Sequence, residues 1–241
     1  LAIIFRNILK SKTLVLKSIL ITFGVFLLLW MFLISVRGPL VSLLIGSSIS
    51  FIFYKREKIK LKNIIMLIAV ILLALFVIYK SLPGFKLKMD EIINTKIELP
   101  TSSNDIYNFN STNVRYGIYY CSLDLIRNNL LFGVGVGDVQ NEMNDCYHNK
   151  IGAKVYLWND YNTHNQFLFF FAAVGVLGIV FFAVMILITF RLAIGRIDII
   201  YFYFILISSV VFLTENVLSR SDGVIFYAFF NSLMLFKTPL K

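Results

Sequence analysis

Residues 161–190 read YNTHNQFLFFFAAVGVLGIVFFAVMILITF. This run contains no Asp, Glu, Lys or Arg, and a helix needs about 20 apolar residues to cross a bilayer. The run therefore predicts a membrane-spanning helix, with His164 and Asn165 at its entry. An ionisable side chain at that point needs a physical reason, because charge is costly close to lipid.

The rest of the chain is also rich in long apolar runs. It has 241 residues, 59% hydrophobic and 15% charged, with a mean hydropathy of +0.81, whereas a soluble domain has about 25% charged residues. Five further runs are uncharged: 18–36, 38–54, 63–79, 199–214 and 223–236. The last two are short for a span unless flanking Lys and Arg side chains reach the headgroups. These runs predict an all-α polytopic membrane protein with about six transmembrane helices.

Basic segments flank the runs and predict their orientation. FRNILKSK (5–12), KREKIKLK (55–62), RLAIGR (191–196) and KTPLK (237–241) account for much of the net charge of +10. The positive-inside rule places them in the cytoplasm, so this charge does not indicate a nucleic-acid partner. The predicted organisation is three spans in 1–80, a long external loop in 81–160 and three spans in 161–241. The chain begins at Leu1, and LAIIF precedes Arg6, so we expect it to be the C-terminal portion of a longer membrane protein.

The external loop has three recognisable parts. SLPGF (81–85) contains a Pro-Gly pair and is expected to turn. VRYGIYYCSLDLIRNNLLF (114–132) has apolar residues at roughly helical spacing, which predicts an amphipathic helix on or near the membrane surface, with Asn113 able to cap its start. The alternating glycines of GVGVG (133–137) permit unusual backbone angles and the close approach of a ligand, although a plain tight turn explains them equally well.

Both cysteines, Cys121 and Cys146, lie in the same loop. An oxidising exterior would permit a disulfide between them, but spacing alone does not fix the geometry, so two free thiols remain the alternative.

Five charged or ionisable residues fall on the predicted outer side: Arg37, Arg115, His164, Glu215 and Arg220. Each has an ordinary interpretation alone: a turn residue, a solvated arginine, an interfacial histidine, or two members of a surface ion pair. Together they suggest more, because guanidinium groups bind phosphate oxygens in pairs and a neutral histidine can accept a proton. His148, in a second His-Asn pair, is interpreted as a solvated loop residue. No metal-binding motif is present, so we predict no metal and no cofactor.

Three stretches carry a resemblance to a known family. They are VRYGIYYCSLDLIRNNLLFGVGVG (114–137), THNQFLFFFAAVGVLG (163–178) and TENVLSRSDGVIFYAFF (214–230). They resemble the O-antigen ligase / O-antigen polymerase superfamily, which has an Arg-led helix ending in a glycine turn, followed by a His-Asn-x-x-Leu motif that enters a span with a GxxG pair. SVRGPL (35–40) is similar to the Ser-Arg-Gly turn of that family, with Val36 interrupting the order.

The resemblance implies a GT-C-like, metal-independent glycosyltransferase in the bacterial inner membrane, with its active site facing the periplasm. The donor would be an undecaprenyl diphosphate-linked glycan, and the acceptor lipid A-core or a second carrier-linked glycan. By the same resemblance Arg37 and Arg115 would bind the diphosphate, His164 would activate the acceptor hydroxyl, and Arg220 and Glu215 would supplement the substrate site.

Two other classes of protein remain open from the sequence. A transporter or flippase of lipid-linked saccharides would also need external arginines and membrane lipid around its spans, but it favours charged residues at mid-span, and these spans are nearly free of charge. A non-catalytic assembly subunit of the envelope would not need a histidine beside arginines.

Overall fold

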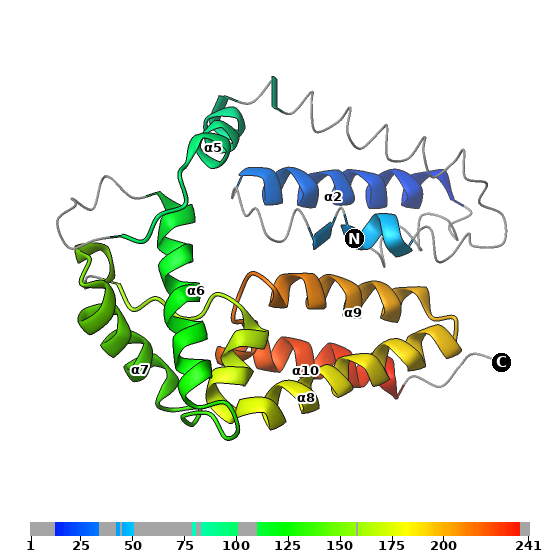
Figure 1. The fold of residues 1–241 in the computed structure, drawn as a ribbon. Coiled ribbons are helices and arrows are strands. Elements are labelled where there is room, and N and C mark those ends of the chain that lie inside the picture. Colours follow the sequence, from blue (N-terminus) through cyan, green and yellow to red (C-terminus); the bar gives the residue numbers. More distant parts are fainter. Residues whose placement is uncertain are drawn as a thin grey trace, which may run out of the picture. The chain divides into compact units, whose positions relative to one another are not determined.

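The computed structural model describes residues 13–33, 42–43, 45–50, 79–80, 83–100, 110–157 and 159–236 (Figure 1). Over these residues the chain is helical and contains no β-strand, which confirms the all-α prediction for this part of the chain. Arg37 lies outside the described residues, as do most of the predicted spans 38–54 and 63–79.

Four predicted spans coincide with apolar helices. They are α2 (Leu14–Leu33), α8 (Gln166–Gly195), α9 (Ile199–Phe212) and α10 (Ser221–Leu235). Among the described helices, only α8 is long and apolar enough to cross a membrane, and only 28% of its most apolar window is buried, as expected for a helix that faces lipid. Leu14–Leu27 in α2, together with α9 and α10, form shorter apolar helices, so the number of six spans stays a prediction.

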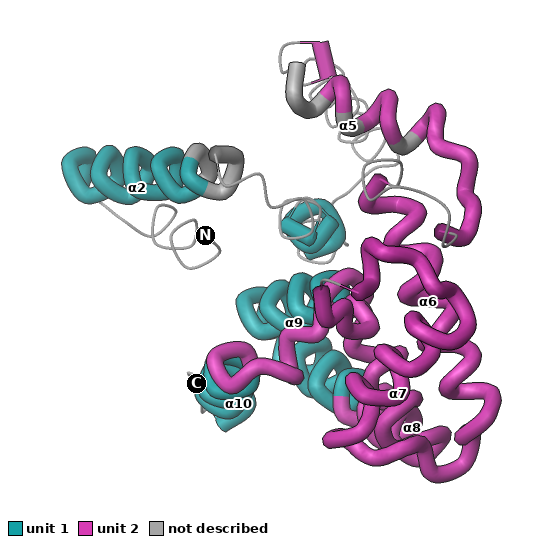
Figure 2. The backbone as a smooth tube through the Cα atoms, turned by 90° about the vertical axis from the view of Figure 1, so that its left-hand side faces the viewer, with its two compact units in different colours: residues 1–56, 186–211, 224–241 teal, residues 57–185, 212–223 magenta. Residues whose placement is uncertain are grey.

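The chain divides into two compact units (Figure 2). Unit 1 comprises residues 1–56, 186–211 and 224–241, and unit 2 comprises residues 57–185 and 212–223. These two units do not test the division into membrane spans (1–80 and 161–241) and an external loop (81–160), which stays a prediction.

Unit 1 is held together by contacts between its apolar helices. Tyr201 on α9 donates a hydrogen bond to Asn231 Oδ1 on α10 over 3.0 Å, and the rings of Phe204 and Tyr227 stack with centroids 5.7 Å apart. The side chain of Asp198 accepts from the backbone N–H groups of Ile200 and Tyr201, which caps the start of α9.

Unit 2 contains the remaining helices: α5 (Pro83–Asn94), α6 (Ser111–Asn128) and α7 (Val139–Cys146). α7 continues into a π-helical turn over Tyr147–Ile151 and a 3₁₀ turn over Lys154–Tyr156. The turn predicted at SLPGF is wrong, because Pro83 and Gly84 begin α5; proline suits this first helical position, where its missing N–H costs nothing.

The helix predicted in 114–132 is confirmed as α6, but its predicted cap is wrong. The cap is Asn110, whose Oδ1 accepts from Thr112 N and Asn113 N at 3.0 and 3.1 Å. Asn113 is instead buried inside the helix, and its Oδ1 accepts from Glu98 N. One face of α6 is buried in the unit, while the position of the helix on or near the membrane surface stays a prediction. The buried residues are Asn113, Val114, Gly117, Ile118, Cys121, Ser122, Leu125 and Ile126.

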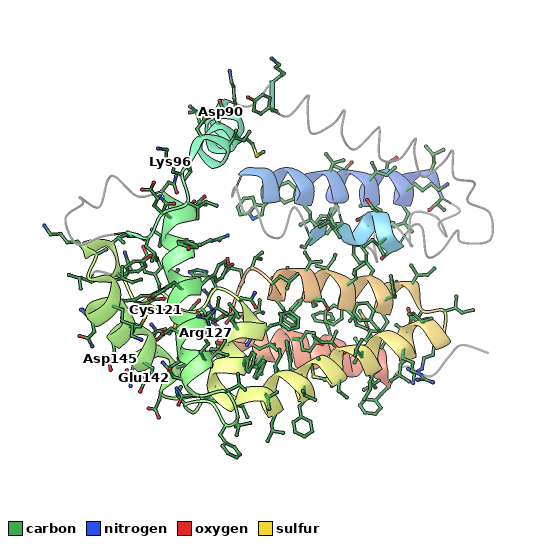
Figure 3. The ribbon with its side chains drawn as sticks, viewed as in Figure 1. Asp90, Lys96, Cys121, Arg127, Glu142 and Asp145 are labelled. Atoms are coloured by element: carbon green, nitrogen blue, oxygen red, sulfur yellow. A yellow bond between two sulfur atoms is a disulfide. The ribbon has the colours of Figure 1, made fainter. Side chains whose placement is uncertain are left out.

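A disulfide and a hydrophobic core join α6 to α7. Cys121 is bonded to Cys146, which decides between the two alternatives left by the sequence (Figure 3 marks Cys121 on α6). Ile118, Met143 and Tyr147 are fully buried around this bond. A helical subdomain therefore forms within the predicted external loop.

The glycine turn docks onto α8 through its backbone. α8 is kinked at Gly175, which has a φ of 69°. The carbonyls of Ala172 and Ala173 at the kink accept from Val134 N and Gly135 N, each over 2.9 Å, and Val176 N donates to Leu130 O. The close approach that the glycines permit is therefore made by the protein's own backbone, which completes the hydrogen bonding that the kink leaves open.

Candidate functional site

His164 stands immediately before the residue that caps α8. The side chain of Asn165 accepts from Phe167 N and Leu168 N at 2.9 and 3.1 Å, as an N-cap does. His164 has a φ of 44°, in the left-handed region that is uncommon for residues other than glycine, and its N–H donates to Asn162 Oδ1 over 2.9 Å. Local hydrogen bonds thus explain the His-Asn pair: the asparagine starts the helix and the histidine lies at its mouth.

The segment around His164 is joined to residues 213–218, about 50 positions later in the chain. Asn216 Oδ1 accepts from Asn165 N over 2.8 Å, and Asn216 Nδ2 donates to Thr163 Oγ1 over 2.8 Å. Asn165 Nδ2 donates to Leu213 O at 3.2 Å, and Gln166 Oε1 accepts from the backbone N–H of residue 218 at 2.7 Å. Asn216, Thr163 and Gln166 are all buried, so these bonds are shielded from water.

This connection brings Glu215 to His164. The distance from His164 Nδ1 to Glu215 Oε2 is 3.6 Å, an ion-pair distance that is longer than a hydrogen bond. The side chains of His164 and Glu215 are 25% and 37% exposed, so a bound molecule can reach both.

Two arginines act on the same imidazole. Burial lowers the pKa of His164 below its ordinary value of 6.5; Glu215 opposes this change, and the positive charges of Arg115 and Arg220 add to it. Both arginines are exposed, and within the part of the chain that the structure describes neither forms an ion pair with a carboxylate. The site therefore combines a histidine that is neutral at pH 7 with two guanidinium groups that are available to an anion.

Tyrosines connect the site to the loop subdomain. The Tyr161 ring lies 6.5 Å from the His164 ring and 5.7 Å from that of Tyr156. Tyr156 donates to Val114 O, beside Arg115, over 2.9 Å, and Tyr147 donates to Tyr161 O over 3.1 Å. Burial raises the pKa of Tyr147 and of Tyr156, so both hydroxyls stay protonated and keep these bonds.

Of the five residues singled out in the sequence, Glu215 thus lies beside His164, and Arg115 and Arg220 are near enough for their charges to act on its imidazole. The fifth, Arg37, lies outside the described residues. His148 is exposed in the π-helical turn. Asn216, Thr163 and Gln166 were missed, because single uncharged polar residues give no periodic or charge signal.

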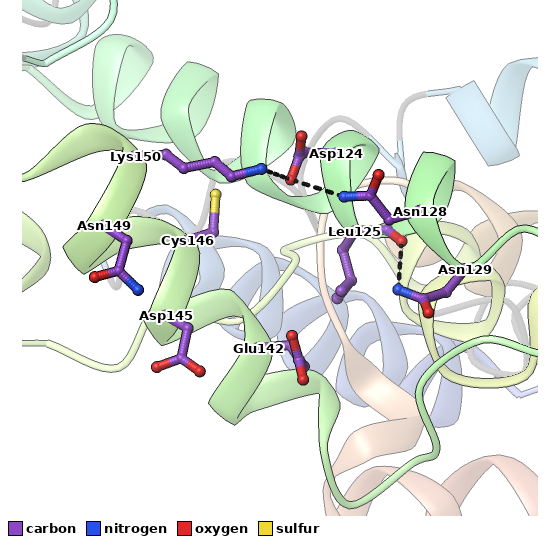
Figure 4. Close-up of a pocket in the computed structure, with 9 residues that line it drawn as sticks. All are labelled: Asp124, Leu125, Asn128, Asn129, Glu142, Asp145, Cys146, Asn149 and Lys150. Atoms are coloured by element: carbon purple, nitrogen blue, oxygen red, sulfur yellow. Dashed lines mark hydrogen bonds and ion pairs between the residues drawn. The ribbon is translucent and has the colours of Figure 1, made fainter.

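A separate polar pocket of about 240 Å³ lies between α6 and α7 (Figure 4). Its lining includes Asp124, whose carboxylate is 2.6 Å from Lys150 Nζ, and Glu142 and Asp145 from α7. Its lining contains none of the five candidate site residues predicted from the sequence. Among the described residues, no three His, Cys, Asp or Glu side chains gather as metal ligands would, and metal independence stays a prediction.

The comparison with protein families gives one result that bears on this arrangement. Residues 22–183 match the family model described as O-antigen ligase, a region that includes Arg37, Arg115 and His164 but ends before Glu215 and Arg220. A comparison with curated proteins gave no match. Because the family match covers more than half of the chain, this protein belongs to the O-antigen ligase family.

Proposed function

We propose that this protein transfers a glycan from undecaprenyl diphosphate to a hydroxyl group of a periplasmic acceptor, either lipid A-core or a second carrier-linked glycan. The family consists of inner-membrane proteins that act in polysaccharide and lipopolysaccharide biosynthesis by glycosyl transfer from lipid-linked glycans. The donor, the acceptor and the residues that act on them are the proposed part.

The observation that carries the proposal is the arrangement around His164 at the mouth of α8: a carboxylate lies 3.6 Å from its imidazole, and the positive charges of Arg115 and Arg220 act on the same ring. A diphosphate leaving group carries negative charge that increases as its bond to the sugar breaks. Guanidinium groups in fixed positions stabilise that charge, which is commonly the largest contribution to catalysis. Arg115 and Arg220 are the proposed diphosphate ligands, with Arg37 as a third.

His164 is the proposed general base. The acceptor oxygen forms a bond to the anomeric carbon, the bond from that carbon to the diphosphate oxygen breaks, and undecaprenyl diphosphate leaves with the electron pair. The proton of the acceptor hydroxyl passes to His164. Because Glu215 faces Nδ1, it favours the tautomer with a proton on Nδ1, which leaves Nε2 to accept this proton. Glu215, predicted from sequence as a substrate ligand, is therefore proposed to orient the base.

The position of the site fits a lipid-linked donor. α8 is apolar enough to cross the membrane, and His164 lies just before it. The proposed site would then be at the level where a diphosphate attached to a membrane-held tail must stay. The Cys121–Cys146 disulfide supports a periplasmic site, because disulfides persist in oxidising compartments. A reaction at a membrane-held diphosphate would explain why the chain places an ionisable residue, His164, at the entry of a span.

Replacement of each of the two histidines tests the proposal. His164→Ala should lower transfer from a purified carrier-linked glycan by roughly 10²- to 10⁴-fold, the contribution of a general base. His148→Ala is the matched control, since it removes the other histidine of a His-Asn pair from an exposed turn, and it should retain activity. Equal activity of the two variants would remove His164 from the mechanism. Movement of the carrier-linked glycan across a vesicle membrane without a new glycosidic bond would favour the transporter.

A further inference from the structure

We infer that Asn216 is a positioning residue: it holds His164 and Glu215 in the relative position that glycosyl transfer requires. This inference rests on the proposed function, and it concerns a residue that itself has no contact with the reacting groups.

The first step is the set of atoms that Asn216 engages. Its Oδ1 accepts from Asn165 N, and its Nδ2 donates to Thr163 Oγ1, each over 2.8 Å. Thr163 Oγ1 also lies 3.0 Å from both Asn165 O and Asn216 Oδ1, to one of which it donates its single proton. One buried amide thus binds the residues immediately before and after His164.

The second step is what these bonds do to the backbone between them. A left-handed φ at a residue other than glycine is strained and persists only where its surroundings enforce it. Asn216 fixes the chain on both sides of His164, and the side chain of Asn162 accepts a hydrogen bond from the His164 N–H. The conformation that turns the imidazole toward Glu215 is therefore imposed by neighbours and is not intrinsic to the sequence.

The third step is covalent. Glu215 directly precedes Asn216, so the amide that fixes His164 also fixes the backbone that carries its carboxylate partner. Loss of the amide would release both members of the pair together. Asn216 is only 2% exposed, so loss of its bonds would leave buried polar groups without partners.

The charged groups that act on His164 come from two segments: Glu215 and Arg220 from residues 212–223, and Arg115 from α6. Burial is the largest influence on the pKa of His164 and lowers it. When the segment loosens, the imidazole becomes more solvated, and its pKa should rise toward 6.5.

The experiment measures the pH profile of transfer by purified protein with the carrier-linked glycan as donor. Asn216→Ala should lower kcat roughly 10- to 100-fold, the effect of a displaced catalytic group, and should move the acid limb of the profile to higher pH. Asn231→Ala is the matched control, because Asn231 also has a side-chain hydrogen bond between two elements, accepting from the Tyr201 hydroxyl over 3.0 Å, and lies in unit 1, whereas His164 lies in unit 2; it should leave the rate and the acid limb unchanged.

Thr163 provides a second test if Asn216→Ala does not fold. Thr163→Val removes the hydroxyl with little change of shape and should reproduce the loss of rate and the shifted limb, whereas Thr163→Ser should restore both. A uniform loss at every pH with an unmoved limb would show a merely structural role, and an unchanged rate would show no role; either result overturns the inference. Full transfer by His164→Ala is a different result, since it removes His164 from the mechanism, and the absence of transfer by the wild type would overturn the proposed function itself.

Discussion

Replacement of Gly133 by alanine tests the docking of the glycine turn onto α8. Gly133 has a φ of 66°, and a Cβ added there would overlap the backbone of Ala172 and Ala173. The left-handed conformation costs a residue with a side chain roughly 1–2 kcal/mol. The overlap would also separate the hydrogen bonds that Val134 N and Gly135 N donate to α8, and each is worth about 0.5–1.5 kcal/mol net. The expected destabilisation is about 2–5 kcal/mol.

The same turn contains its own control. Gly137 has no atom within 4 Å of an added Cβ, so Gly137→Ala should change stability by less than about 0.5 kcal/mol. Thermal unfolding of the purified variants in detergent, together with the amount of protein in the membrane, measures both changes. Gly133→Ala should melt several degrees below Gly137→Ala. Equal melting temperatures would refute the contact between the turn and the kink of α8.

Three further predictions concern the cap, the disulfide and the base. Asn110→Ala should destabilise the protein by about 1 kcal/mol in thermal unfolding, and no change would contradict its role as the cap of α6. Joint replacement of Cys121 and Cys146 by serine should cost roughly 3.5 kcal/mol, from the chain entropy of a 25-residue loop, with the reduced wild type behaving like the variant. Transfer should fall as the pH drops through the pKa of His164, below 6.5, because only the neutral imidazole accepts a proton. Glu215→Gln removes a charge that raises this pKa and should move the acid limb to lower pH, whereas Arg220→Gln should move it to higher pH; shifts of the same sign would contradict the arrangement.

The apolar helices could be predicted from sequence because their signal is local. A run without charges, such as 199–214, predicts a helix close to α9 wherever the rest of the chain lies. The side of the membrane on which His164, Glu215 and Arg220 were placed also came from local charge. Their proximity in the structure does not depend on that placement, which stays a prediction.

The loop subdomain could not be predicted in the same way, because its contacts are distant in sequence. The apolar stripe of α6 looks the same whether lipid or protein covers it, and only the partners on α7 and around Tyr147 decide the outcome. The cap was misplaced for a related reason. NFNSTN offers asparagines at 108, 110 and 113, and Asn113 is excluded by its burial and by its bond to Glu98 N, neither of which a local pattern contains.

The proposed chemistry requires two conditions that oppose each other at His164. A site for a diphosphate needs positive charge, but positive charge lowers the pKa of a nearby histidine and weakens it as a base. Burial at the mouth of α8 acts in the same direction. A carboxylate close to Nδ1 offsets both effects, which gives Glu215 a physical reason to lie 3.6 Å from the imidazole. Glu215 and Arg220 come from one short segment that Asn216 ties to the chain on either side of His164, so a single connection sets the balance between binding the leaving group and activating the acceptor.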